Sequence, residues 1–150
     1  MKRPEINLAF SEMEIHYMKG GGWINTSVLD IDGTGEVRAY LIRHASSVIL
    51  DSARMILNDS EKERLVELSS SFSTYEDYYQ PDDYRTDQDD HSLVLIHEQI
   101  PDTVRVYDPG RADLPDGLRR ILEEMESFWE ETLGLPLALG ITAGLRQLLC

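Results

Sequence analysis

The most specific chemical pattern in this chain is a pair of aspartates, Asp30 and Asp32, in the stretch VLDIDGTGEV. They follow an apolar run and lead into Gly33, Thr34 and Gly35. Paired carboxylates at the end of a strand are candidates for acid–base or nucleophilic chemistry. The same residues are also typical of a β-hairpin turn. In such a turn Asp accepts hydrogen bonds from backbone N–H groups, and Gly adopts positive φ. In a hairpin, we expect positive φ at both glycines and the two aspartates at the mouth of the turn.

An apolar strand that runs into Asp-x-Asp-Gly-Thr resembles the first motif of the haloacid-dehalogenase-type phosphotransferases. The resemblance implies that Asp30 is the nucleophile, that Asp32 is the acid/base and that Mg²⁺ is bound. Such an enzyme also needs a lysine to stabilise the phosphorylated aspartate. Its sheet should be parallel, with the site at the carboxyl ends of the strands.

The rest of the chain departs from this enzyme pattern. The three lysines are Lys2, Lys19 and Lys62, and only Lys62 follows the motif, in the first turn of an expected helix. The acidic pairs at 82–83 and 89–90 precede a strand-like segment instead of following one. We therefore favour the hairpin and expect no catalytic residue, with the phosphatase as the alternative.

The segment of residues 73–90 combines seven Asp or Glu residues with four tyrosines. Tyrosines provide rigid, amphipathic contact area at protein interfaces, and carboxylates beside them steer a basic partner. We predict that the residues that bind a partner are Tyr75, Tyr78, Tyr79, Asp82, Asp83 and Tyr84. The alternative is an ordinary surface loop with two of its tyrosines packed onto a sheet.

Four residues with even spacing would share one face of a strand: Asp87, Asp89, His91 and His97. Histidine and aspartate on one face are able to hold a transition metal. However, Leu93 and Leu95 would share that face, which indicates a core face with a histidine at each end. We therefore expect neither a metal nor a cofactor.

Charge and composition narrow the function further. The 150 residues include 28 Asp or Glu and 14 Lys or Arg, a formal net charge of −14. Nucleic acids and anionic membranes repel a chain with this negative charge. We therefore expect no binding to either. The single cysteine, Cys150, allows no internal disulfide, and no signal peptide or apolar stretch of about 18 residues is found. These features predict a cytoplasmic location.

Periodicity predicts one α+β domain over residues 1–150. Expected strands cover 12–18, 24–31, 36–43, part of 46–57, 91–99 and 103–108, with Pro101 in a turn. Expected helices cover 57–72, capped by Asp59 or Ser60, and 114–134. We expect a mainly antiparallel sheet of four to five strands, with both helices packed on one face. The apolar segment 135–150 is expected to dock on the core or, alternatively, to form a homodimer.

The run of residues 23–128 resembles a group of small bacterial domains. The features that carry the resemblance are the glycine-rich start KGGGWINTSVLDIDGTGEV, the helix SEKERLVELSSSF, the acidic loop, the strand pair DDHSLVLIHE and TVRVYD, and the final LPDGLRRILEEMESF. One branch of similar outline is the emfourins, which are protein inhibitors of thermolysin-like metallopeptidases. The resemblance implies a non-enzymatic domain that contacts a protein. We therefore expect a non-catalytic protein-binding module of the inhibitor or immunity type.

Overall fold

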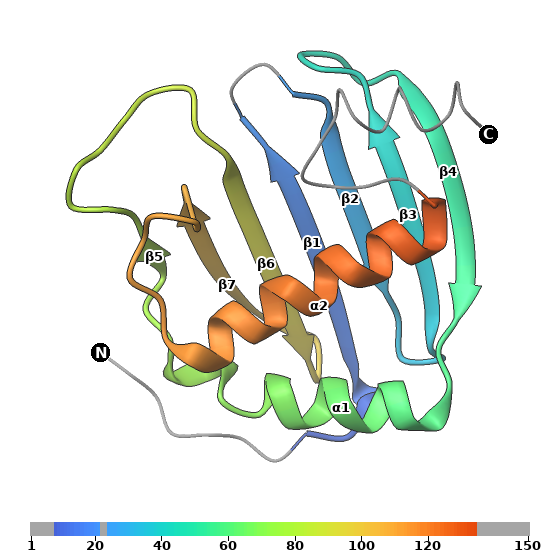
Figure 1. The fold of residues 1–150 in the computed structure, drawn as a ribbon. Coiled ribbons are helices and arrows are strands. Elements are labelled where there is room, and N and C mark those ends of the chain that lie inside the picture. The colour runs from blue at the N-terminus through green and yellow to red at the C-terminus, as the bar shows by residue number, and fades with distance from the viewer. Residues whose placement is uncertain (1–7, 22–23, 135–150) are drawn as a thin grey trace.

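The computed structural model describes residues 8–21 and 24–134 (Figure 1). The apolar segment 135–150, predicted to dock on the core or to form a homodimer, lies outside these residues. The described strands are β1 (Met13–Gly20), β2 (Thr26–Ile31), β3 (Glu36–Ile42), β4 (Ile49–Ile56), β5 (Tyr78–Tyr79), β6 (Asp90–His97) and β7 (Ile100–Tyr107). The helices are α1 (Asp59–Ser69) and α2 (Asp116–Leu133), with short 3₁₀ turns η1 (Phe10–Glu12) and η2 (Phe72–Thr74).

The strands of the described residues form one seven-stranded sheet in the order β4-β3-β2-β1-β6-β7-β5. Neighbours are antiparallel except β5 and β7, which are parallel. The predicted α+β class is therefore confirmed, but four to five strands was too few and the sheet is mixed. The prediction missed β5 because two residues are too few to show an alternation. Two residues of the acidic segment form β5, which pairs with β7 and is the last strand on that side of the sheet.

One face of the sheet forms the core. Burial alternates along β1 with a period of two, and Ile15 and Tyr17 point toward the helices while Glu14, His16 and Met18 point away. The helix-side residues of β2, β3, β6 and β7 continue the same layer, since paired residues share a face. The strand-side core is Met13, Ile15, Tyr17, Leu29, Ile31, Val37, Ala39, Leu93, Leu95, Val104 and Val106.

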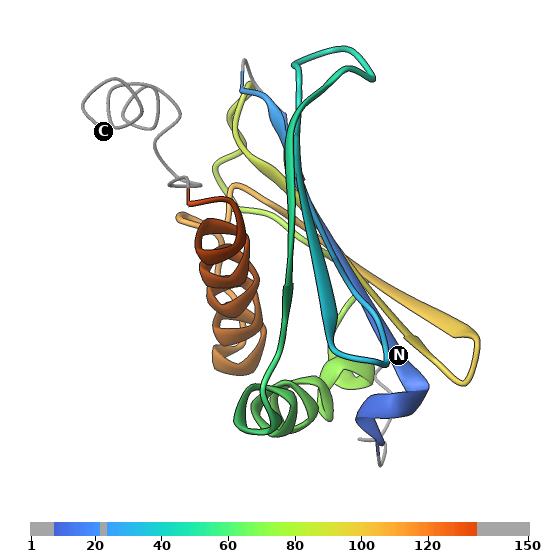
Figure 2. The same ribbon diagram turned by 90° about the vertical axis from the view of Figure 1, so that its right-hand side faces the viewer.

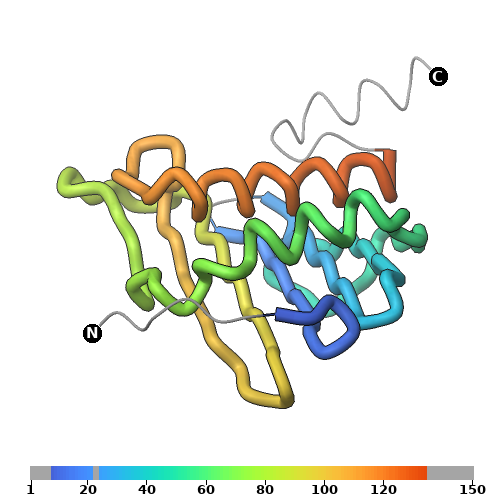
Figure 3. The backbone as a smooth tube through the Cα atoms, turned by 90° about the horizontal axis from the view of Figure 1, so that it is seen from below, coloured from blue at the N-terminus to red at the C-terminus, as the bar shows by residue number. Residues whose placement is uncertain are grey.

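Both helices lie on that side of the sheet and run beside one another (Figures 2 and 3). The apolar stripe of α2 is buried, and the Nε1 of Trp129 donates to the carbonyl of Tyr40 in β3 at 3.0 Å. The stripe consists of Leu118, Ile121, Leu122, Met125, Phe128 and Trp129. The α2 helix ends at Gly134, whose φ of 70° forms a left-handed cap. Within the described residues, neither helix is long and apolar enough to cross a membrane.

The N-cap of the first helix lies one residue before Asp59 and two before Ser60, the two predicted caps. Asn58 is the N-cap, and its side chain and that of Glu61 form a capping box. The N–H of Leu57 still donates to the carbonyl of Gly35 at 2.9 Å, so the chain leaves the sheet at that residue. The first side chain after the sheet that is able to cap a helix is therefore Asn58. Ser60 and Glu63 have the same spacing as Asn58 and Glu61, but the capping box is formed by the latter pair.

Pro101 lies inside β7, opposite Ile96, and not in the turn where we predicted it. The outer neighbour β5 pairs with β7 only at Arg105 and Val106. At Pro101 the strand therefore has no described neighbour on its outer side. Proline is tolerated at such an edge because its missing N–H removes no ladder bond.

Candidate functional site

The second face of the sheet carries no described helix, as the edge-on view shows (Figure 2). Residues that pair across neighbouring strands point to the same face, so they form rows across it. One row crosses all seven strands through Ser52, Tyr40, Val28, Met18, Ser92, Arg105 and Tyr78. The adjacent row contains Arg54, Arg38, Asp30, His16, Val94 and Thr103. We call this surface the open face.

His16 lies at the centre of the open face between two carboxylates. Its Nδ1 is 2.7 Å from Asp30 Oδ1 on the neighbouring strand, and its Nε2 is 3.3 Å from Glu14 Oε2. Partial burial of the ring lowers the pKa of His16, but the hydrogen bonds and charges of the two carboxylates outweigh it. The net effect is that the pKa of His16 is raised above its ordinary value, so the imidazolium persists to a higher pH than in a free side chain.

Charged side chains continue this row toward the β4 edge. Glu36 forms ion pairs with Arg38 at 3.3 Å and with Arg54 at 3.1 Å. The two arginines also line a shallow open hollow of about 350 Å³ with Tyr40, Ser52 and Ala53. The open face therefore combines apolar residues such as Val28, Met18 and Val94 with charged ones, and protein contact surfaces contain both kinds.

The predicted partner-binding tyrosines divide into two groups. Tyr75 and Tyr79 turn inward and pack against the core, and the Oη of Tyr79 accepts a hydrogen bond from the N–H of Glu76 at 2.9 Å. Tyr78 and Tyr84 are 44% and 55% exposed. Tyr75 and Tyr79 are therefore partly buried, whereas Tyr78 and Tyr84 expose more of their side chains.

The exposed part of the loop is held in place by contacts with β7 and the segment after it. Tyr84 stacks on Tyr107 with ring centroids 4.9 Å apart. Asp83 is exposed, and its carbonyl and carboxylate accept hydrogen bonds from Arg111 at 2.7 and 3.2 Å. Asp82 is also exposed. The acidic residues and the two outward tyrosines thus form a fixed rim at the β5 edge of the sheet.

Asp30 and Asp32 belong to an antiparallel hairpin between β2 and β3, as predicted. The carboxylate of Asp32 turns back into the turn and accepts from the N–H and hydroxyl of Thr34 and from the N–H of Glu36. Asp30 points to the open face, where it meets His16. The two carboxylates therefore have separate structural partners, and β2 lacks the parallel neighbours that the phosphatase motif implies.

The two glycines of the hairpin differ in their roles. Gly35 has a φ of 90°, as predicted, whereas Gly33 is not among the described glycines with positive φ, so that prediction was wrong. A Cβ on Gly33 would lie 2.6 Å from the carbonyl oxygen of Ser11. Gly33 is thus required by the close approach of the η1 segment and not by its backbone angles.

The four evenly spaced candidates for metal binding are not brought together. His91 pairs with Lys19 near the start of β6, whereas His97 pairs with Met13 at its end. His91 is 1% exposed, and its Nδ1 forms a 2.8 Å hydrogen bond with the hydroxyl of Tyr17. The set is therefore divided between the core and the far end of the sheet.

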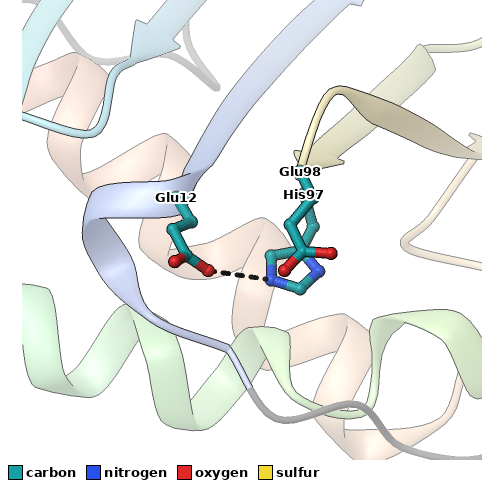
Figure 4. A group of neighbouring side chains, drawn as sticks. All are labelled: Glu12, His97 and Glu98. Carbon is teal, nitrogen blue, oxygen red and sulfur yellow. Dashed lines mark ion pairs between the residues drawn. The ribbon is translucent and has the colours of Figure 1, made fainter.

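A different group of possible metal ligands lies at that far end. Glu12, His97 and Glu98 each offer one ligand atom, and these atoms lie within 4.8 Å of one another (Figure 4). The sequence did not point to this group because Glu12 lies far along the chain from the adjacent residues His97 and Glu98. Only the pairing of β1 with β6 brings them together.

No family model matches the chain, and no curated protein matches it closely enough to count as a relative.

Proposed function

We propose that this chain is a non-catalytic, acidic module of the inhibitor or immunity type, located in the cytoplasm, that binds another protein through its open face and the adjoining acidic rim. The observation that carries the proposal is the cross-strand row from Ser52 to Tyr78. It runs across the full width of the sheet with no described helix above it. Met18, at its centre, is 47% exposed.

The apolar and aromatic side chains of this row supply contact area. Val28 and Met18 pair across neighbouring strands, and Tyr40 lies beside them on β3. At the other end Tyr78 lies over Arg105, whose guanidinium carbon is 6.0 Å from the ring centroid. Tyrosine and arginine are the residue types enriched in the energetically dominant part of protein interfaces.

The charge of the protein indicates the chemistry of the partner. A net charge of −14 and the exposed rim of Asp82 and Asp83 attract a basic protein surface. Such steering raises the rate of association and makes that rate fall with salt. The resemblance to emfourins suggests thermolysin-like metallopeptidases as the first class of partner to assay.

The test is affinity capture from native lysate followed by assays on purified partners. A rim variant, Tyr78→Ala/Asp82→Ala/Asp83→Ala/Tyr84→Ala, and a face variant, Met18→Arg, should each lose the partner that the wild type retains. The control Glu67→Ala/Glu123→Ala removes the same number of carboxylates from exposed positions on the helices, and it should retain that partner. Capture of the same proteins by all variants, or of none by the wild type, would contradict the proposal.

A further inference from the structure

We propose that Glu12, His97 and Glu98 form a binding site for a divalent transition-metal ion such as Zn²⁺ at the end of the β1–β6–β7 sheet (Figure 4). The proposal is independent of the protein-binding function. Imidazole and carboxylate together are ligands that zinc accepts, whereas Mg²⁺ and Ca²⁺ prefer oxygen alone.

The strongest indication is the imidazole of His97. Its Nε2 is buried from solvent and has no hydrogen-bond partner among the described residues. The nearest carboxylate oxygen, Oε2 of Glu12, is 3.8 Å away, which is too far for a hydrogen bond. A buried polar atom without a protein partner is rare in folded proteins, and binding of an ion or a water molecule is an ordinary explanation for one.

The spacing of the ligand atoms suits a small cation. Two ligands bound to tetrahedral zinc at about 2.0–2.1 Å lie roughly 3.4 Å apart. The Glu12–His97 separation of 3.8 Å is close to that value, and all three ligand atoms lie within 4.8 Å of one another. The carboxylates of the two exposed glutamates need to move by only about 1 Å to bind, which side-chain torsions allow. Three protein ligands leave a fourth position open for water or another ligand.

The backbone fixes the positions from which the three side chains project. Met13 pairs with His97 in the ladder, and the N–H of Glu98 donates to the carbonyl of Glu12 at 3.2 Å. Glu98 and Gln99 then form a two-residue turn with φ of 51° and 67°. This pattern is a type I′ turn, which closes a hairpin tightly. Because strand pairing and a tight turn hold the ligands, binding requires no ordering of a loop.

The test is calorimetric titration of the full chain with ZnCl₂, in a Cys150→Ser background that removes the only thiol. We expect one zinc ion per chain. Glu12→Gln, His97→Gln and Glu98→Asn should each weaken binding by about tenfold or more. Glu98→Asn is informative because Asn is favoured in a type I′ turn. This variant therefore removes a ligand without destabilising the turn.

Two matched controls should bind zinc within about twofold of the wild type, a difference below ~0.5 kcal/mol. Gln99→Gly alters the same turn and removes no ligand. His16→Gln removes the other imidazole that lies between carboxylates. Equal affinity in the ligand variants, loss of binding in His16→Gln, or no saturable binding up to about 1 mM zinc would overturn the site. Equally tight binding of Mg²⁺ would overturn the role of the imidazole.

Discussion

The hydroxyl of Tyr17 and Nδ1 of His91 form a 2.8 Å hydrogen bond in the core, where each residue is 1% exposed. Burial raises the pKa of the Tyr17 phenol well above its ordinary value, so the hydroxyl keeps its proton. The other ring nitrogen of His91, Nε2, has no hydrogen-bond partner among the described residues. Burial and the adjacent charge of Lys19 lower the pKa of His91 to about 3, despite the opposing charge of Asp90.

The depressed pKa of His91 should make the fold sensitive to acid. In the unfolded chain the imidazole binds a proton below about pH 6.5, whereas in the native protein it does so only near pH 3. Stability is therefore complete above about pH 6.5 and falls as the pH drops toward 3, by up to ~1.4 kcal/mol per pH unit. Urea unfolding between pH 7 and pH 4 measures this slope.

The variant Tyr17→Phe/His91→Leu removes both polar partners of the buried pair and should show a shallower slope than the wild type. His16→Gln, which changes an imidazole on the open face, should not flatten the acid slope. If the double variant keeps the slope of the wild type, His91 is not the group that binds the proton on unfolding.

A second prediction concerns His16, whose pKa is shifted in the opposite direction. Its raised pKa means that its contribution to stability is complete below about pH 6.5 and is lost as the pH rises through the native pKa. Asp30→Asn removes the hydrogen-bonded charge and should lower the midpoint of His16 toward 6.5. An NMR titration of the imidazole resonances measures this midpoint. The control Asp82→Asn should leave it unchanged, and an unchanged midpoint in Asp30→Asn would contradict the pairing.

Much of the fold was predictable because it depends on local patterns. The apolar stripe from Leu118 to Trp129 has helical spacing, and the alternation along β1 has the spacing of a strand. Local patterns failed where a distant contact decided the outcome. The cap at Asn58 is set by where β4 leaves the sheet, and the need for glycine at position 33 is set by Ser11.

The candidate sites were less predictable for the same reason. Asp30 was singled out for its neighbour Asp32, yet its partner is His16, 14 residues away in sequence. His97 was grouped with residues of its own segment, yet it lies beside Glu12. Each pair depends on strand register, which the spacing of residues within one segment does not reveal. Glu98 and Gln99, which were expected in the strand 91–99, form the turn between β6 and β7.

The third prediction tests the structural role of Asp32. Its carboxylate accepts three hydrogen bonds within the hairpin, and those bonds lower its pKa. Asp32→Ala should destabilise the protein by about 1 kcal/mol, because exposed hydrogen bonds of this kind contribute modestly. Denaturant unfolding measures the change, with Asp59→Ala at the exposed start of α1 as a surface control. A neutral effect of Asp32→Ala would show that the turn does not depend on the carboxylate.

The fourth prediction concerns the turn that joins β6 to β7. Glu98 and Gln99 both adopt positive φ, which costs non-glycine residues free energy in the folded state. Replacing them with Asn-Gly should raise the free energy of unfolding by about 1 kcal/mol, the strain relief being partly offset by the greater freedom of glycine in the unfolded chain. Thermal and urea unfolding in the presence of a chelator measure this gain without metal. The single change Gln99→Gly should give part of it. A loss of stability in both variants would mean that the side chains of Glu98 and Gln99 stabilise the hairpin by more than their backbone strain costs.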